Sequence, residues 1–239
     1  MLIYVVVQEK ESYYAEGPEG RVKARLEQAS GERCLVVPYQ EFDQSVVNQL
    51  QPRAIAMSGF GGHFQLRKVE WFLGMNQVLH QADLPILCFC GSHQLLGFAF
   101  NRDLAQVSLL EDEPMRKLGP EEDLPRRAQQ SPEVDLSPFF VAGGFFPIRR
   151  IQDDPLFHGL PEVMTMRCAH YCEVKQLPPG FELLASSQHC PIEAMRHRER
   201  PLYGTQFHPE AYEPPFLDGR TLLENFARIV RDFWSGHKA

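Results

Sequence analysis

One cysteine stands where a reactive nucleophile is expected. Cys90 follows an apolar run, Leu84 to Phe89, with the length and composition of a strand buried on both faces. Small residues follow, and then apolar residues at helical spacing from Leu95 to Ala99. A nucleophile on such a strand-to-helix turn is lifted out of the sheet, and free N–H groups at the helix start favour a thiolate. The pattern predicts that Cys90 is a nucleophile.

Two other interpretations of this stretch stay open. A lone cysteine after an apolar run is more often a small core residue. Cys88 is a rival nucleophile, because residues two apart share one face of a strand. However, Cys88 lies inside the predicted strand, next to the bulky Phe89. Only Cys90 has an amide side chain, Gln94, one helical turn further on, and this favours Cys90.

A candidate base and a group that could orient it lie near the end of the chain. His208 and Glu210 flank Pro209 in the stretch Tyr203-Gly-Thr-Gln-Phe-His-Pro-Glu210. In an extended chain their side chains point to the same face, so the carboxylate can orient and charge-stabilise the imidazole. A lone His-x-Glu is more often a surface pair, and metal binding is a second alternative that no further ligand motif supports.

The glycine loop Ser58-Gly-Phe-Gly-Gly62 also follows a predicted strand. It matches neither a dinucleotide-binding motif nor a P-loop, because no Lys-Ser/Thr pair follows. It could be a plain turn. Beside a nucleophile, its backbone N–H groups could stabilise an oxyanion.

The elements that must position these residues alternate along the first hundred residues. Strands are predicted at 2–7, 34–37, 54–57 and 84–89, with helices between them, one capped by Asp43 and one carrying Leu66 to Leu79. The alternation predicts an α/β fold with a mostly parallel sheet and helices on both faces. Sites in such sheets lie beyond the carboxyl ends of the strands, which is where the glycine loop and Cys90 fall.

The pattern changes after Phe100. Residues 111–138 are polar, with five prolines and little apolar periodicity, and predict a polar insertion at about 111–142. Short strand-like segments between turn signals then predict an antiparallel extension of the sheet, and Asp218 to Trp234 predicts a helix. With no convincing linker, we expect residues 1–239 to form a single domain.

Composition narrows the function. The 239 residues carry a net charge of -7, which argues against a nucleic-acid partner, and no apolar run is long enough to span a membrane. The chain starts with a strand-like segment rather than a signal peptide. The six cysteines form no CxxC pair and no finger-like spacing with histidine. We therefore expect no metal, no cofactor, reduced thiols and a cytoplasmic location.

Together, Cys-Gly-Ser-His-Gln-Leu-Leu from Cys90 and Tyr-Gly-Thr-Gln-Phe-His-Pro-Glu from Tyr203 resemble the class I (triad-type) glutamine amidotransferases. The segments 154–161, 177–185, 191–194 and 219–226 look like the same family, especially the glutaminase domain of guanosine monophosphate synthetases. The resemblance covers nearly the whole chain except about 111–142. It implies a flavodoxin-like fold with an antiparallel extension.

The resemblance also implies roles for individual residues. Cys90 would attack the side-chain amide of glutamine to give a thioester and ammonia, His208 would shuttle protons, and Glu210 would hold His208. The amides of Phe60 and Gly91 match the family's oxyanion hole. Four further residues match positions that hold the substrate: Gln94, Ala169, Tyr171 and Cys172.

Three functions remain in consideration. The first is a glutaminase module with L-glutamine as substrate, which supplies ammonia to a separate synthase or ligase subunit. The second is a γ-glutamyl hydrolase or peptidase of the same fold, with water as the final acceptor. The third is a catalytically silent binding module, which has no physical need for a complete nucleophile, base and orienting acid.

Overall fold

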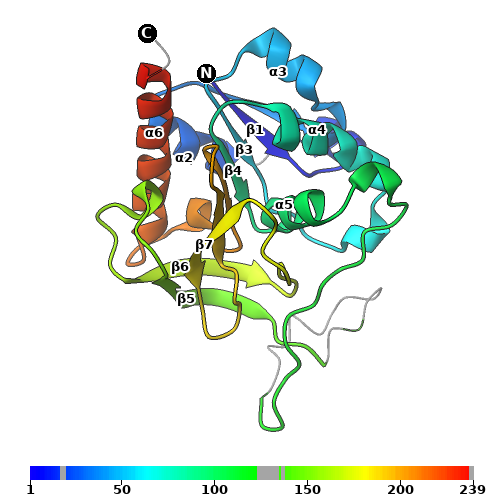
Figure 1. Ribbon diagram of the computed structural model, residues 1–239, viewed down its shortest axis with the longest axis vertical. Coiled ribbons are helices and arrows are strands. Elements are labelled where there is room, and N and C mark those ends of the chain that lie inside the picture. Colours follow the sequence, from blue (N-terminus) through cyan, green and yellow to red (C-terminus); the bar gives the residue numbers. More distant parts are fainter. Residues whose placement is uncertain (17–19, 123–134, 136–137, 237–239) are drawn as a thin grey trace.

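A single sheet organises the molecule (Figure 1). The computed structural model describes residues 1–16, 20–122, 135 and 138–236. In these residues nine strands lie side by side. Their order across the sheet is β2 (Cys34–Pro38), β1 (Leu2–Val6), β3 (Ala54–Met57), β4 (Ile86–Phe89), β9 (Leu202–Thr205), β8 (Ala194–His197), β7 (Phe181–Ser186), β5 (Ala142–Arg150) and β6 (Val163–His170).

Strand direction divides the sheet into two parts. Strands β2, β1, β3, β4 and β9 are parallel, and β4 pairs directly with β9. From β9 to β6 each neighbouring pair is antiparallel. The predicted fold class, a parallel core with an antiparallel extension, is confirmed. The pairing of β4 with β9 matters most, because it brings the chain after Phe89 beside the chain after Thr205.

Helices cover both faces of the sheet. Alternate residues of β1 enter two separate hydrophobic cores, as expected for a strand buried on both faces. One core includes apolar residues of α2 (Gly20–Ser30) and α6 (Asp218–Gly236). The other includes apolar residues of α3 (Gln44–Leu50), α4 (Leu73–Gln81) and α5 (Gly91–Asn101).

Most helices agree with their local signals. Asp43 caps α3, where its carboxylate accepts hydrogen bonds from the N–H groups of Ser45 and Val46. The predicted helix from Leu66 to Leu79 is wrong in its first half: two 3-10 turns, Phe64–Leu66 and Val69–Phe72, precede α4. The sequence analysis missed α1 (Lys10–Glu16) altogether.

The start of the predicted insertion is packed rather than loose. Met115 is buried in a core, and its N–H donates to the carbonyl of Tyr171. Lys117 forms a bridge with Phe139 at the other end of the segment. The sequence predicted a polar insertion with little apolar periodicity, and the buried Met115 corrects that expectation in part. Residues 123–134 and 136–137 of the insertion lie outside the described residues.

One sheet takes strands from Leu2 to Thr205, and a single domain over residues 1–239 stays a prediction. In the described part of the chain, no helix has the length and apolar character needed to cross a membrane.

Candidate active site

Cys90 occupies the turn between β4 and α5. It is the N-cap of α5, with a φ of 44° and a ψ of -104°. Only a few non-glycine residues adopt positive φ, and such conformations cost about 1–3 kcal/mol and cluster at active sites. The Cys90 N–H donates to the carbonyl of Thr205 at 2.7 Å, so the end of β9 holds the turn in place. The predicted strand-to-helix turn at Cys90 is confirmed.

The structure separates the two candidate nucleophiles. Cys88 is fully buried inside β4, and burial raises the pKa of its thiol, so the reactive thiolate is disfavoured. Cys90 lines a pocket together with Gly91 and Gln94. Its sulfur lies 3.6 Å from the Gln206 amide nitrogen and 3.9 Å from the Ala169 carbonyl oxygen. The geometry therefore favours Cys90.

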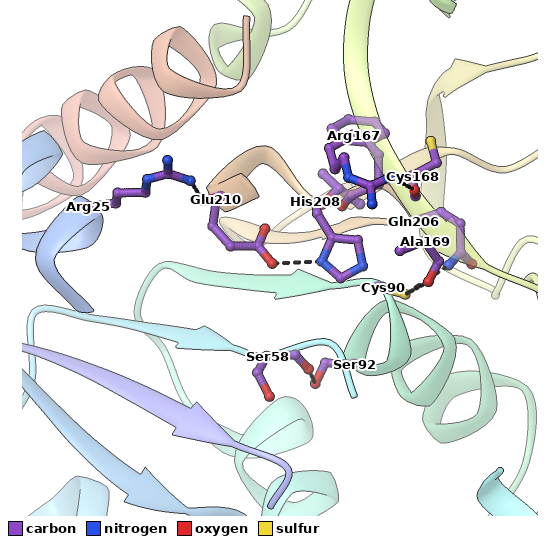
Figure 2. Close-up of polar contacts among 12 residues, drawn as sticks. Arg25, Ser58, Cys90, Ser92, Arg167, Cys168, Ala169, Gln206, His208 and Glu210 are labelled. Atoms are coloured by element: carbon purple, nitrogen blue, oxygen red, sulfur yellow. Dashed lines mark hydrogen bonds and ion pairs between the residues drawn. The ribbon is translucent and has the colours of Figure 1, made fainter. Parts of the chain in front are cut away.

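His208 lies between Glu210 and Cys90 (Figure 2). Its Nδ1 and the Oε1 of Glu210 are 2.7 Å apart, and its Nε2 has no hydrogen-bond partner. The backbone differs from the extended form that we expected, because a 3-10 turn, Pro209–Ala211, begins directly after His208. Even so, the turn brings the two side chains together and leaves Nε2 available for proton exchange with Cys90.

The surroundings of His208 favour its protonated form. Burial alone lowers the pKa of this imidazole, but the Glu210 carboxylate and the Cys90 sulfur outweigh it and raise the pKa well above its usual value.

Arg25 of α2 donates to the carbonyl oxygens of Glu210 and Tyr212 and lies over the Tyr212 ring. Sequence analysis missed Arg25, which is 185 residues away from Glu210 in the chain.

The glycine loop packs directly against the triad of Cys90, His208 and Glu210. A Cβ atom on Gly59 would lie 2.7 Å from His208 Cε1 and 3.0 Å from Cys90 Cβ. A Cβ atom on Gly91 would lie 2.4 Å from the Phe60 ring. The Phe60 ring therefore packs on Gly91, and an oxyanion hole built from the amides of Phe60 and Gly91 stays a prediction. The loop motif singled out Phe60, but the need for glycine at position 59 appears only in three dimensions.

The residues matched to substrate binding gather around Cys90. Gln94 donates to the Cys172 carbonyl at 2.9 Å and also contacts the Gln206 amide oxygen at 3.2 Å. One pocket is lined by these seven candidate residues: Phe60, Cys90, Gly91, Gln94, Ala169, Tyr171 and Cys172. An adjoining cleft of about 410 Å³ shares Phe60 and Ala169 with this pocket and is also lined by His208 and Glu210.

A polar network holds the glycine loop against the start of the predicted insertion. Asp112 Oδ2 lies 2.5 Å from His63 Nδ1, and Asp112 Oδ1 accepts from the Phe64 N–H at 2.8 Å. The Tyr171 hydroxyl donates to the Gly62 carbonyl at 2.7 Å and lies 2.7 Å from the same His63 nitrogen. Neither Asp112 nor His63 was singled out in the sequence, because no local motif links them.

Comparison with known proteins assigns the chain to a family. The sequence profile of "Glutamine amidotransferase class-I" matches residues 21–230. A glutamine-hydrolyzing GMP synthase subunit from Pyrococcus furiosus is 48% identical over 188 residues, which cover 77% of this chain and 78% of that protein. The Archaeoglobus fulgidus protein of the same name is 34% identical over 155 residues, covering 64% of this chain and 66% of the relative.

The chain thus spans slightly less than two thirds of the Archaeoglobus relative, and 43% of a Pyrococcus abyssi relative of the same name. A crystal structure of a candidate GMP synthase subunit from Thermoplasma acidophilum has a TM-score of 0.70. It is 21% identical and covers 100% of this chain and 98% of that one, a likeness that shows the fold. From the profile match and the Pyrococcus furiosus relative it follows that the chain belongs to the class I glutamine amidotransferase family.

Proposed function

We propose that this chain is the glutaminase subunit of a GMP synthase, in which it hydrolyses the side-chain amide of glutamine and passes ammonia to a synthetase subunit. The observation that carries the proposal is the strained Cys90 turn facing a His208–Glu210 pair held at 2.7 Å. The names of the curated relatives supply the acceptor reaction. They also favour glutaminase over the γ-glutamyl hydrolase alternative.

In the first half-reaction, His208 Nε2 holds the proton that comes from the Cys90 thiol, and the sulfur attacks the amide carbon of glutamine. The carbonyl electron pair moves onto oxygen, where the N–H groups of Gly91 and Phe60 stabilise the charge. When the carbonyl re-forms, the C–N bond breaks, and His208 returns the proton to the departing ammonia. A thioester on Cys90 remains.

In the second half-reaction, water takes the place of ammonia. His208 accepts a proton from the water, whose oxygen attacks the thioester carbon. Collapse of this second tetrahedral intermediate breaks the C–S bond, and the proton passes back to sulfur. Glutamate leaves, and the thiol of Cys90 is restored. Glu210 keeps Nδ1 hydrogen-bonded throughout, so Nε2 is the atom that exchanges protons.

Labelling with a glutamine analogue tests the nucleophile. Incubation with 6-diazo-5-oxo-norleucine is expected to add mass to the peptide containing Cys90, and Cys90→Ala is expected to abolish both labelling and glutamine hydrolysis. Cys88→Ala is the matched control and is expected to retain both, with some loss of stability. Label on Cys88 would overturn the assignment. Hydrolysis of γ-glutamyl peptides but not of glutamine would favour the γ-glutamyl hydrolase.

The partner is tested with the assembled enzyme. A synthetase subunit that co-purifies with this chain is expected to make GMP from glutamine in its presence. Cys90→Ala is expected to abolish synthesis from glutamine and to leave synthesis from ammonium salts intact. Loss of both would show that the variant disrupts assembly rather than ammonia supply. All six cysteines are buried free thiols, which supports a reducing, cytoplasmic location for this complex.

A further inference from the structure

A second group of reactive side chains lies behind the candidate active site. Cys168 and His170 are two residues apart in β6, and Glu193 directly precedes β8. One ligand atom from each residue lies within 4.8 Å of the other two. All three residues are buried, with exposed fractions of 1%, 4% and 2%. Figure 2 shows the Cys168 sulfur pointing away from Cys90. His170 lines the same pocket as Cys90, so the group adjoins the candidate active site but includes no member of the triad.

Two polar atoms of this group lack the partners that burial demands. His170 Nε2 and Glu193 Oε2 are buried and make no hydrogen bond. An unpaired buried polar group costs about 1–3 kcal/mol, so such atoms in native proteins usually face a water or an ion. The other ring nitrogen, His170 Nδ1, donates to the Cys172 carbonyl at 3.0 Å. That bond fixes the tautomer in which the Nε2 lone pair is available, the arrangement typical of metal-bound histidines.

The donor set and its charge fit a divalent ion. Thiolate, imidazole and carboxylate together suit zinc rather than the oxygen-seeking magnesium or calcium. A thiolate and a carboxylate carry two negative charges, which one Zn²⁺ neutralises, so the site can be buried without net charge. Bonds of about 2.0–2.3 Å in a tetrahedron place ligand atoms about 3.3–3.8 Å apart. From the 4.8 Å limit, the ligand atoms need to move closer together by at most about 1.5 Å to reach that geometry.

We propose that Cys168, His170 and Glu193 bind one Zn²⁺ ion. Water completes the tetrahedron. Sequence spacing did not reveal this group, because Glu193 lies 23 residues beyond His170, in the connection between β7 and β8. Our expectation of no metal rested on the lack of a CxxC pair and of finger-like spacing between cysteine and histidine.

The ion would hold in place the residues that contact the Cys90 sulfur. Ala169, whose carbonyl contacts the Cys90 sulfur, lies between two of the ligands. Gln206, whose amide also contacts that sulfur, donates its backbone N–H to the Glu193 carbonyl at 2.7 Å. Zinc would therefore link the segment of Ala169 to the segment of Gln206, and both of these residues contact the Cys90 sulfur. It takes no part in proton transfer.

Metal content tests the proposal independently of glutaminase activity. Measurements use the Cys90→Ala chain, because Cys90 and His208 could bind zinc adventitiously. The chain is stripped with a chelator, loaded with Zn²⁺ against a chromophoric competitor, and analysed by mass spectrometry for zinc. We expect one ion per chain, strongly reduced affinity in Cys168→Ser and Glu193→Gln, and unchanged affinity in Cys34→Ser, a control buried thiol on β2. Circular dichroism checks folding.

A second measurement needs no substitution at the site. Co²⁺ in place of Zn²⁺ is expected to give the near-ultraviolet band of a cobalt–thiolate bond. Bound Zn²⁺ is expected to protect Cys168, but not Cys34, from alkylation in mild urea. The proposal is overturned if the folded Cys90→Ala chain binds no zinc, if Cys168 is not protected, or if folded Cys168→Ser and Glu193→Gln bind as tightly as their parent. In those cases a protonated Glu193 and a water account for the cluster.

Discussion

At the scale of single residues, Gly59 lets the candidate base and nucleophile approach each other. A side chain there would need the space that His208 Cε1 and Cys90 Cβ occupy. A displacement of about 1 Å in reacting groups can cost about 100-fold in rate. Space, rather than a polar contact, is what Gly59 contributes to the site.

Gly59→Ala is therefore expected to lower kcat for glutamine hydrolysis about 100-fold. Gly61→Ala is the matched control in the same loop, because a Cβ there meets no atom within 4 Å. Steady-state kinetics and thermal unfolding of both variants make the comparison. Equal activity in both variants would mean that the loop yields and that Gly59 has no special role.

Glu210 sets the ionisation of His208. Its carboxylate helps to raise the His208 pKa, so the imidazolium persists to higher pH than a free histidine would allow. Removing the negative charge lowers that pKa, and the imidazolium is lost at lower pH. Glu210→Gln is expected to move the basic limb of the kcat/KM profile to lower pH and to reduce turnover less than His208→Ala does.

Glu224→Gln serves as the control for charge alone, since Glu224 lies exposed on α6 and pairs with Arg220. Its profile is expected to match that of the unmodified chain. If folded Glu210→Gln and His208→Ala were equally inactive, Glu210 would do more than orient the base.

At the scale of elements, local sequence signals explain some helices and strands, and others depend on contacts with distant residues. The strand that ends at Phe89 and the cap at Asp43 follow from neighbouring residues, so the sequence predicts them. The 3-10 turns before α4 do not, because their apolar spacing also fits a helix. Gly74 lies against the Phe42 carbonyl, where a Cβ would clash at 2.1 Å. Packing against Phe42 therefore influences the path of the backbone into α4.

The residues of the candidate site fall into the same two groups: those that lie in local motifs and those that meet only through long-range contacts. The triad lies in two short motifs, which is why its members could be chosen from the sequence. Asp112 and His63 are 49 residues apart, and Tyr171 and His63 are 108 apart. A single sequence contains no pattern that pairs residues at such distances. The same argument covers Cys168, His170 and Glu193.

The Asp112 network is expected to position the Phe60 amide. Losing one oxyanion-hole donor costs about 100- to 1,000-fold, and loosening the loop is expected to cost a part of that, about tenfold in kcat for Asp112→Asn. Asp153→Asn is the control, because Asp153 is almost fully exposed beside Arg150. Unchanged kcat with a lower Tm in Asp112→Asn would mean that the network stabilises the fold alone.

At the scale of the whole molecule, the segment that joins α5 to β5 borders the candidate site, because its Asp112 lines the same pocket as Cys90. Asp112 of this segment holds the glycine loop, Met115 is buried in a core, and Lys117 forms a bridge with Phe139 near the end of the segment. In Figure 1 the segment (green) runs down past β5, away from α3 and α4. The site and the start of the predicted insertion are thus in contact, and we expect a partner bound to one to affect the other.

The acidic and basic clusters of the insertion extend from Glu111 to Arg127, and those beyond Glu122 lie outside the described residues. A long polar segment in a compact enzyme is often functional, although loop insertion costs little free energy. We expect that the synthetase subunit docks on this segment, and that glutaminase activity is low until the docked partner orders the Phe60 loop. Replacing 123–137 with a Gly-Ser link keeps Asp112 and its network. Glutamine hydrolysis alone is then expected to stay unchanged, while stimulation by the synthetase subunit is lost. If the synthetase still bound the shortened chain and stimulated it to the same extent, the insertion would be a tolerated surface loop.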